Sequence, residues 1–277
     1  MDHDAIREIS AGGGPRAEGI PALIDSHAHL DDRKYDEDRL AVLARALEAG
    51  VKTIINIGYD LRSSAASVCL THDHPFIYAA VGFHPSDSKG YTDQAEEQLR
   101  TWCQTEPKVV AVGEIGLDFH WDNSPRDVQR EVFRRQIRLA KEVNKPIVVH
   151  DREAHGEIMD ILREESAAEA GGVLHCFSGS LEMAKVCLQM GFYISLAGPV
   201  TFTNAPKVRE IAAKVPLDRL LIETDSPYLT PHPYRGQRNE SAHVRLVAEA
   251  VASARGIPLE ELAAATTANA KRLFGIV

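Results

Sequence analysis

The chain has 277 residues, and 31 Lys and Arg against 40 Asp and Glu give it a formal net charge of −9. A composition of 44% hydrophobic and 26% charged residues excludes the collagen-like, disordered and coiled-coil classes, and the length suits one large α/β domain. The acidic balance disfavours nonspecific binding to nucleic acid or anionic membranes, because the field of the molecule repels polyanions.

The first segment, residues 1–20, contains three consecutive glycines and no sustained apolar period. This pattern predicts a flexible leader at 1–20 and a folded domain at 21–277. There is no apolar run of about 18 residues and no signal peptide, so we expect a cytoplasmic location without membrane association. The four cysteines form no C-x-x-C pair, which predicts reduced thiols.

From residue 22 onward, short apolar runs predict eight β-strands. In chain order the predicted strands are Ala22–Leu30, Val51–Gly58, Phe76–His84, Val109–Asp118, Pro146–Asp151, Gly172–Ser178, Phe192–Ala197 and Arg219–Ser226. Several of these runs are almost wholly apolar, as is typical of a parallel sheet buried on both faces.

Longer stretches with apolar residues at helical spacing lie between the strands. They include Asp38–Ala49, Ala95–Glu106, Arg126–Val143, Glu157–Glu165, Leu181–Met190 and Ala205–Val215. Eight strand-helix units in about 250 residues predict an α/β fold, a (β/α)8 TIM barrel in a single domain. A doubly wound open sheet is the alternative, but no glycine-rich nucleotide-binding fingerprint opens any of the helices.

Histidines and carboxylates stand at the C-terminal ends of these strands. They are Asp25, His27, His29, His84, Glu114, His150, His175, Glu223 and Asp225. In a barrel this is the face that carries the active site. Residues two apart on a strand share a face, so we expect His27 to lie beside His29.

The chemistry of these side chains favours a metal centre. Two imidazoles on one face repel each other when both are protonated, whereas a shared metal ion can bind both of them in the neutral form. A buried carboxylate lowers stability unless it is paired or bound to a metal. Two divalent cations can satisfy four imidazoles and two carboxylates together, and a nitrogen and oxygen donor set without thiolates fits zinc, manganese or a related metal better than calcium. The predicted ligands are His27, His29, Glu114, His150, His175 and Asp225.

Three further side chains receive separate predictions. His84 is a candidate substrate contact or a support for a ligand, and Glu223 is expected to orient a ligand by a hydrogen bond. Cys176 follows His175 directly, so we expect it to point to the opposite face of its strand as a packed thiol.

With these residues in place, the sequence resembles the TatD family of metal-dependent deoxyribonucleases, within the amidohydrolase-like barrels, from about Leu23 to Phe274. The matching segments are DSHAHL at Asp25–Leu30, VGFHP at Val81–Pro85, VGEIGLDFH at Val112–His120, PIVVHDREAH at Pro146–His155, HCFSG at His175–Gly179 and LIETDSPYLTPHPYRGQRNE at Leu221–Glu240.

The resemblance implies a division of the ligands between two divalent ions per subunit, Zn²⁺, Mn²⁺ or Mg²⁺. His27 and His29 with Asp225 would hold one ion, His150 with His175 the other, and Glu114 would bridge both. Asp225 is then the candidate that orients a water and takes its proton, so Asp225 and Glu114 are the predicted catalytic residues. Arg152, Arg235 and Arg238 are candidate phosphate contacts.

The predicted function is hydrolysis of DNA phosphodiester bonds, and the resemblance implies 3′-to-5′ cutting of single strands. DNA is the predicted partner, with no obligate protein partner. One alternative is another ester or amide substrate on the same site, such as an aminoacyl ester. The related amidohydrolases place a lysine where Glu114 stands, which favours the nuclease-like branch. A noncatalytic metal-dependent binding protein is the second alternative.

Overall fold

Eight parallel strands follow one another in sequence order in a single sheet. The computed structural model describes residues 21–121 and 123–277, so the predicted leader at 1–20 lies outside the described residues. The strands are β1 Leu23–Ala28, β2 Val51–Ile57, β3 Ile77–Val81, β4 Val109–Asp118, β5 Ile147–Arg152, β6 Gly172–Leu174, β7 Tyr193–Leu196 and β8 Leu220–Ile222.

The sheet closes on itself between its first and last strands. Ala28 forms a parallel bridge with Ser226, and the Asp225 N–H donates to the His27 carbonyl at 2.9 Å. The predicted (β/α)8 TIM barrel is therefore confirmed.

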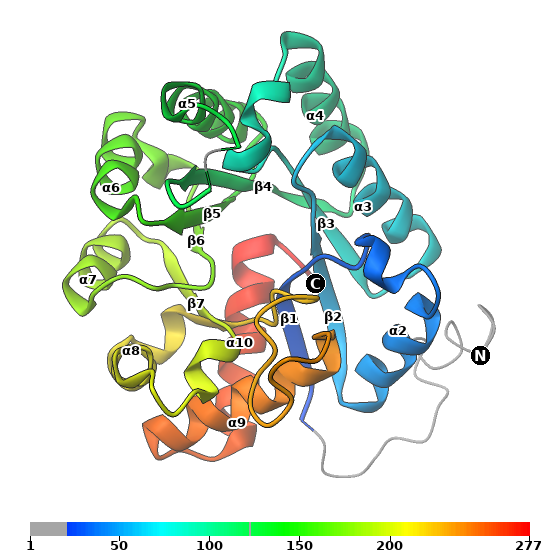
Figure 1. Cartoon of the computed structure of the whole chain (residues 1–277), viewed down its shortest axis with the longest axis vertical. Coiled ribbons are helices and arrows are strands. Elements are labelled where there is room, and N and C mark those ends of the chain that lie inside the picture. The colour runs from blue at the N-terminus through cyan, green and yellow to red at the C-terminus, as the bar shows by residue number, and fades with distance from the viewer. Residues whose placement is uncertain (1–20, 122) are drawn as a thin grey trace.

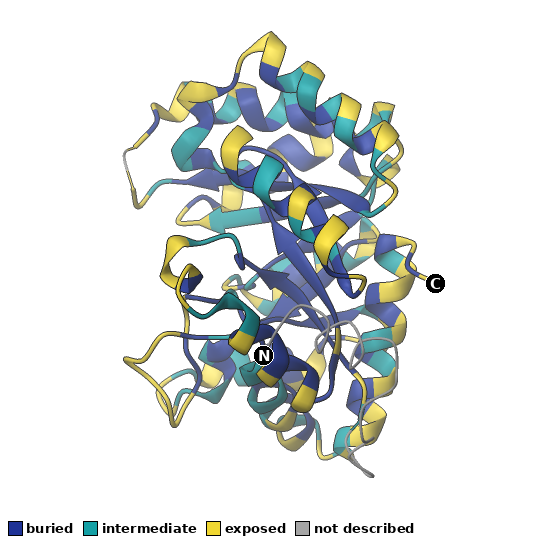
Figure 2. Ribbon diagram, turned by 90° about the vertical axis from the view of Figure 1, so that its right-hand side faces the viewer, coloured by how far each residue is buried: buried dark blue, intermediate teal, exposed yellow. Residues whose placement is uncertain are grey.

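Helices surround the barrel, as Figure 1 shows. They are α2 Arg39–Glu48, α3 Leu61–Asp73, α4 Asp93–Thr105, α5 Arg126–Glu142, α6 His155–Glu164, α7 Leu181–Gln189, α8 Pro206–Lys214, α9 Val244–Arg255 and α10 Leu259–Phe274. In Figure 2 the strands are almost wholly buried, whereas the helices alternate between buried and exposed positions. Each helix within the described residues is too short or too polar to cross a membrane.

Two apolar layers hold the barrel together. The larger layer packs the outer faces of the strands against the helices, as Leu23 and Ile77 do. The smaller layer fills the barrel interior with side chains such as Ile24 and Val148, and α10 adds Phe274 to it. Because α10 helps to fill this interior, the polar residues at the C-terminal ends of the strands are left to form the open end of the barrel.

The strands stop sooner than predicted at the edge where the polar residues gather. The prediction extended β6 to Ser178 and β8 to Ser226, but these strands end at Leu174 and Ile222. Beyond those ends the backbone enters the left-handed region, with φ of 40° at Cys176 and 54° at Asp225. The chain therefore leaves the regular pleat where it must aim functional side chains.

Candidate metal centre

The first half of the site gathers around the end of β1. His27 Nε2 lies 3.2 Å from His29 Nε2, so the two imidazoles meet as predicted. Asp225 Oδ1 lies 3.5 Å from both nitrogens, and Glu114 Oε2 lies 3.5 Å from His27 and 3.8 Å from His29. Four donor atoms, from β1, the residue that follows it, β4 and the segment after β8, thus surround one point.

The second half uses the other oxygen of the same glutamate. Glu114 Oε1 lies 2.7 Å from His150 Nδ1 and 2.7 Å from His175 Nε2. These two nitrogens are 3.2 Å apart. Glu114 therefore presents one carboxylate oxygen to each pair of histidines.

Local irregularities in two strands aim these ligands. The pairing of β1 with β2 shifts register between Asp25 and Ala28, and the pairing of β4 with β5 shifts between Val112 and Ile115. Such shifts turn a side chain away from the regular alternation, and they are frequent beside active sites. They bring His27 and Glu114 to the cluster in strands whose earlier residues pack in apolar layers.

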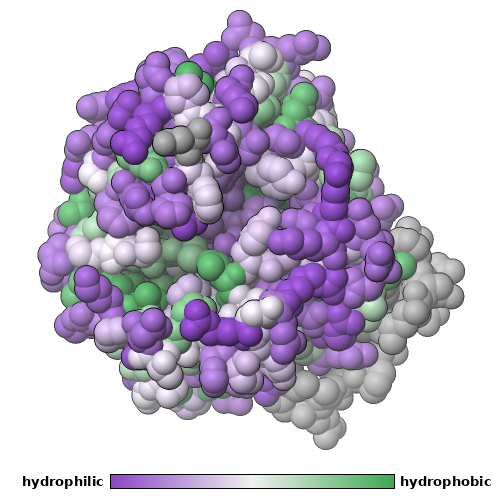
Figure 3. All heavy atoms as spheres, in the orientation of Figure 1, coloured by the Kyte–Doolittle hydropathy of each residue, from purple (hydrophilic) through white to green (hydrophobic). Residues whose placement is uncertain are grey.

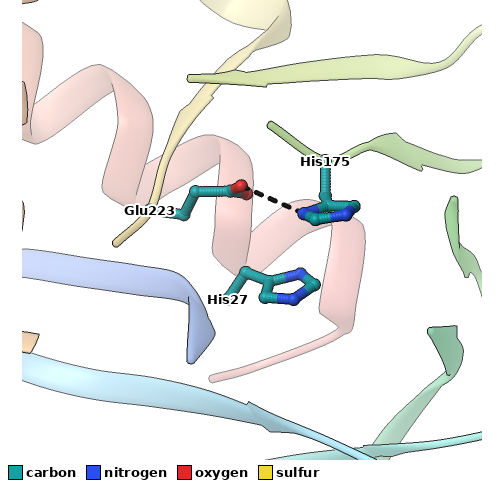
Figure 4. A group of neighbouring side chains, drawn as sticks. All are labelled: His27, His175 and Glu223. Carbon is teal, nitrogen blue, oxygen red and sulfur yellow. Dashed lines mark hydrogen bonds and ion pairs between the residues drawn. The ribbon is translucent and has the colours of Figure 1, made fainter. Parts of the chain in front are cut away.

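Outer hydrogen bonds orient three of the four imidazoles. His29 Nδ1 faces the Ile57 carbonyl oxygen at 2.9 Å, and His150 Nε2 faces Asp118 Oδ2 at 3.1 Å. His175 Nδ1 faces Glu223 Oε1 at 3.2 Å, the contact drawn in Figure 4. Each outer nitrogen must carry the proton to satisfy its acceptor, so each inner nitrogen presents a lone pair to the cluster.

The fourth imidazole is held by packing. The His27 ring stacks on His175 with centroids 4.0 Å apart, and Figure 4 shows the His27 ring beneath that of His175. Its Nδ1 is buried, and no partner for it is found among the described residues. His27 thus relies on neighbouring rings for its orientation.

The donor set fits divalent cations. Inner lone pairs of His29, His150 and His175 converge with the carboxylates of Glu114 and Asp225, and converging lone pairs are stable only around protons or cations. Groups of three ligands with a geometry suited to a metal include His27, His29 and Glu114, and also Glu114, His150 and His175. Imidazole and carboxylate donors without thiolate match zinc, manganese and related ions.

The ionisation of the cluster supports the same conclusion. Burial would raise the pKa of Glu114, but the facing imidazoles, His175 first, hold it well below its usual range. Burial would lower the pKa of His29, but the Asp225 and Glu114 carboxylates outweigh burial and raise it to about 9. Without cations the carboxylates therefore hold protons on His29, His150 and His175, whereas burial and the facing His175 lower the pKa of His27. Cation binding releases the protons that are held.

The cluster opens into a cavity of about 760 Å³. Its lining includes His29, Glu114, His150, His175 and Asp225, and Figure 3 shows a face of the molecule that is hollowed near its centre within a mostly hydrophilic surface. A cavity of this size admits part of a polymer or a small molecule.

Two of the remaining candidates lie at this cavity. His84 and Arg152 line it, and His84 Nε2 is 3.8 Å from Glu114 Oε1. Glu223 lies behind the cluster, where it contacts His175 and also accepts the Cys176 N–H at 2.7 Å. The structure thus brings these three candidates together with the six predicted ligands.

The other two arginine candidates lie elsewhere. The Arg238 guanidinium pairs with Asp38 at 2.7 Å and lies over the Tyr35 ring. The Arg235 guanidinium lies over the Phe202 ring, 4.1 Å from its centroid. Neither side chain lines the cavity.

The expectation for the orientation of Cys176 is wrong. It assumed that the strand continues through His175, but β6 ends at Leu174 and Cys176 has a left-handed backbone. Cys176 therefore lines the same cavity as His175. Desolvation, followed by the nearby Glu223 and Asp225 carboxylates, raises the pKa of its thiol well above the usual range, so the thiol stays protonated and weakly nucleophilic.

The sequence analysis missed one residue of the site, Asp118, and named another, Asp25, without giving it a role. Asp118 holds His150 through Oδ2, and its Oδ1 accepts the N–H groups of His120 and Trp121 at 2.9 and 3.0 Å. The sequence could have indicated Asp118, because it is a carboxylate at the end of the predicted fourth strand, as the other candidates are at the ends of theirs. Asp25 is fully buried and accepts the N–H and hydroxyl of Thr224 at 2.9 and 2.7 Å, so it supports the backbone next to Asp225.

Comparison with known proteins identifies similar chains. The family model described as TatD related DNase matches residues 24–275. An uncharacterized metal-dependent hydrolase of Bacillus subtilis, YabD, is 50% identical over 257 residues, which cover 92% of this chain and 99% of that protein. The 3′-5′ ssDNA/RNA exonuclease TatD of Shigella flexneri is 37% identical over 260 residues, with 92% of this chain and 99% of the relative covered.

A solved structure shows the same architecture. The crystal structure of YjjV, a TatD homologue from Escherichia coli K12, superposes with a TM-score of 0.87 at 34% identity. The match covers 92% of this chain and 98% of that one. The similarity therefore extends over the whole barrel.

Proposed function

The chain belongs to the TatD family of metal-dependent hydrolases, and from this premise we propose that it hydrolyses DNA phosphodiester bonds with two divalent cations. The observation that carries the proposal is the position of Glu114, whose two carboxylate oxygens face two separate histidine pairs. This arrangement suits paired cations acting on one phosphate.

We assign the ligands according to these distances. His27, His29 and Asp225 would hold one cation and His150 with His175 the other, with Glu114 shared between them. Bound divalent cations supply Lewis-acid chemistry, since they lower the pKa of water towards neutrality and neutralise charge developing on phosphoryl oxygens.

Side chains on the cavity lining would accept the proton of the attacking water and contact the phosphate. Burial would raise the pKa of Asp225, but His29 and the other facing imidazoles lower it, so this carboxylate is ionised near neutral pH. It lines the cavity and is our candidate to orient the attacking water and accept its proton. His84 and Arg152, on the same lining, would contact the phosphate.

A single strand is the substrate that we favour. The Shigella relative carries the name of a 3′-5′ ssDNA/RNA exonuclease, and this similarity supports single-strand cutting from a 3′ end. Zn²⁺, Mn²⁺ and Mg²⁺ are the candidate ions, and the donor set suits each of them in part.

The direct test compares substrates and metals. Purified protein is incubated with end-labelled single-stranded and duplex DNA, with a lactone and with an aminoacyl ester, in Mg²⁺, Mn²⁺, Zn²⁺ or chelator. We expect shortening of the single strand from its 3′ end with metal and none with chelator. Intact DNA alongside turnover of the ester or lactone would reject the nuclease assignment, and binding of DNA without turnover of any substrate would favour a noncatalytic binding protein.

A further inference from the structure

Two large aromatic side chains are exposed on the cavity lining. Trp121 and Tyr228 both line the cavity, and their exposed fractions are 53% and 47%. Exposed rings on a cavity lining leave apolar surface in water, and a ligand in the cavity can cover it.

The rings stand on opposite sides of the metal cluster. Trp121 follows β4 and Tyr228 follows β8, and strands four apart face each other across a closed barrel of eight. Both residues lie close to a predicted ligand histidine. Asp118 accepts the backbone N–H of Trp121 at 3.0 Å and contacts His150, and the centroid of the Tyr228 ring lies 6.2 Å from that of His29.

The cationic side chain of another residue lies over each ring. The Arg152 guanidinium lies 5.7 Å from the centroid of Trp121, and Lys34 Nζ lies 4.4 Å from the centroid of Tyr228. Neither cation forms an ion pair within residues 21–121 and 123–277. Arg152 and Lys34 are therefore available to an anionic ligand.

The rest of the cavity lining carries several carboxylates, so the two cations matter for the binding of an anionic ligand. The lining also contains Asp87, Asp118 and Asp151, and the whole chain has a net charge of −9. A polyanion thus gains little from the general field of the protein. Stacking of bases on aromatic rings does not depend on net charge and is worth about 1–3 kcal/mol per base.

We propose that the ring–cation pairs Trp121–Arg152 and Tyr228–Lys34 each bind one nucleotide of an unpaired strand. The base stacks on the ring, the adjoining phosphate contacts the cation, and the strand between them crosses the Glu114 cluster. This inference rests on the proposed nuclease function and adds the basis of its strand preference. Paired bases in a duplex are stacked on one another and cannot engage the two rings, so duplex ends are poor ligands.

Tryptophan fluorescence gives a test that does not require hydrolysis. The chain contains two tryptophans, and Trp102 packs against the apolar core on α4. Trp102→Phe therefore leaves Trp121 as the reporter. With metal present, we expect oligothymidylate with cleavage-resistant phosphorothioate linkages to quench this fluorescence, whereas an abasic strand of equal length does not. Equal quenching by both strands, or none by either, would overturn the stacking inference.

Steady-state kinetics separates the inference from the proposed function. Trp121→Ala and Tyr228→Ala should each raise KM for oligothymidylate by about tenfold, with kcat and abasic-strand cleavage little changed. Tyr234→Ala is the matched control, because Tyr234 is 42% exposed but lies outside the cavity lining, and it should behave as wild type. Wild-type protein that cuts both strands with one KM contradicts the inference alone, whereas protein that cuts neither strand contradicts the nuclease function as well.

Discussion

Glu114 is the residue on which both halves of the cluster depend. Its side chain is 4% exposed, and its two oxygens serve different histidine pairs. Glu223 also lies near one histidine of each pair, His27 and His175, but among the carboxylates of the described residues only Glu114 has oxygens within 4 Å of all four imidazoles. Its loss would leave converging imidazoles without the shared negative charge that favours cations.

Substitution of the two predicted catalytic carboxylates should separate metal binding from turnover. Glu114→Ala is expected to lose both metals, whereas Asp225→Asn keeps most of its metal and loses about 10²- to 10⁴-fold in turnover because the proton acceptor is gone. Elemental analysis and initial rates check this division. Glu153→Gln, an exposed carboxylate paired with His120, is the control and should retain both properties. Two metals per chain in Glu114→Ala would contradict the shared-ligand assignment.

Asp118 controls which nitrogen of His150 carries the proton. Burial would raise the pKa of Asp118, but the bond to His150 and the N–H groups that it accepts lower it to about 2. Asp118→Asn keeps the shape but turns an amide N–H toward His150 Nε2, which moves the imidazole proton to the inner nitrogen. We expect metal affinity to fall by about 10- to 100-fold, measured by competition with a chelating dye. Unchanged affinity would show that Asp118 supports only the backbone at His120 and Trp121 and does not affect metal binding through His150.

At the scale of elements, the sequence predicted the regular parts and missed the irregular ones. β4 was predicted with its observed bounds, Val109–Asp118, because a long apolar run leaves little choice. Helix α3 was not among the predicted stretches, since its buried face carries Ser63, Ser64 and Ser67 and hides the apolar period. The clustered histidines and carboxylates could be predicted because strand ends converge in a barrel, whereas Trp121 lies in a loop that no periodicity describes.

The contact between β4 and β5 depends on a glycine. Gly116 pairs in register with His150, and its φ of 145° is unfavourable for other residues. A Cβ there would overlap the His150 carbonyl oxygen. Gly116→Ala should therefore lower the free energy of unfolding by about 2 kcal/mol or more and weaken metal binding through His150.

Gly156→Ala is the control for this substitution. Gly156 lies in α6, and a Cβ there has no atom within 4 Å. We expect unchanged or slightly raised stability, by about 0.5–1 kcal/mol, from helix propensity. Chemical denaturation of both variants is the measurement. Equal destabilisation would mean that the β4–β5 contact plays no special part.

Ion pairs join α5 to the end of α6, and their contribution to stability should depend on pH. Arg138 donates to Glu165 at 2.7 and 2.8 Å, and Arg134 adds a contact at 3.2 Å. The bonds from Arg138, then from Arg134, lower the pKa of Glu165. Because the folded pKa lies below the unfolded value of about 4.3, this stabilisation is complete above that value and is lost as pH falls through the folded pKa.

Glu165→Gln should accordingly cost about 1 kcal/mol of unfolding free energy at pH 7, with a smaller difference from wild type in acid. Urea denaturation at pH 7 and at the lowest pH where the wild type remains folded provides the comparison. Glu210→Gln removes one exposed pair with Lys214 and should change stability less. A cost for Glu165→Gln that is independent of pH would exclude the ionic origin.

At the scale of the whole molecule, an acidic protein is proposed to bind an acidic substrate, and the cavity is where the two can attract each other. The chain carries −9, but two divalent cations would add positive charge inside the cavity, where Glu114 and the histidines converge. Affinity for a strand should then depend mainly on bound metal, and chelated protein should bind DNA weakly at physiological salt.

The most direct test is cleavage of a 3′-labelled single strand as Mn²⁺ is added in equivalents to chelator-treated protein. We predict no cleavage without metal and a rate that rises to its maximum at two equivalents per chain. A full rate with chelator present, or a maximum at one equivalent, would contradict two-metal phosphodiester hydrolysis at the Glu114 cluster.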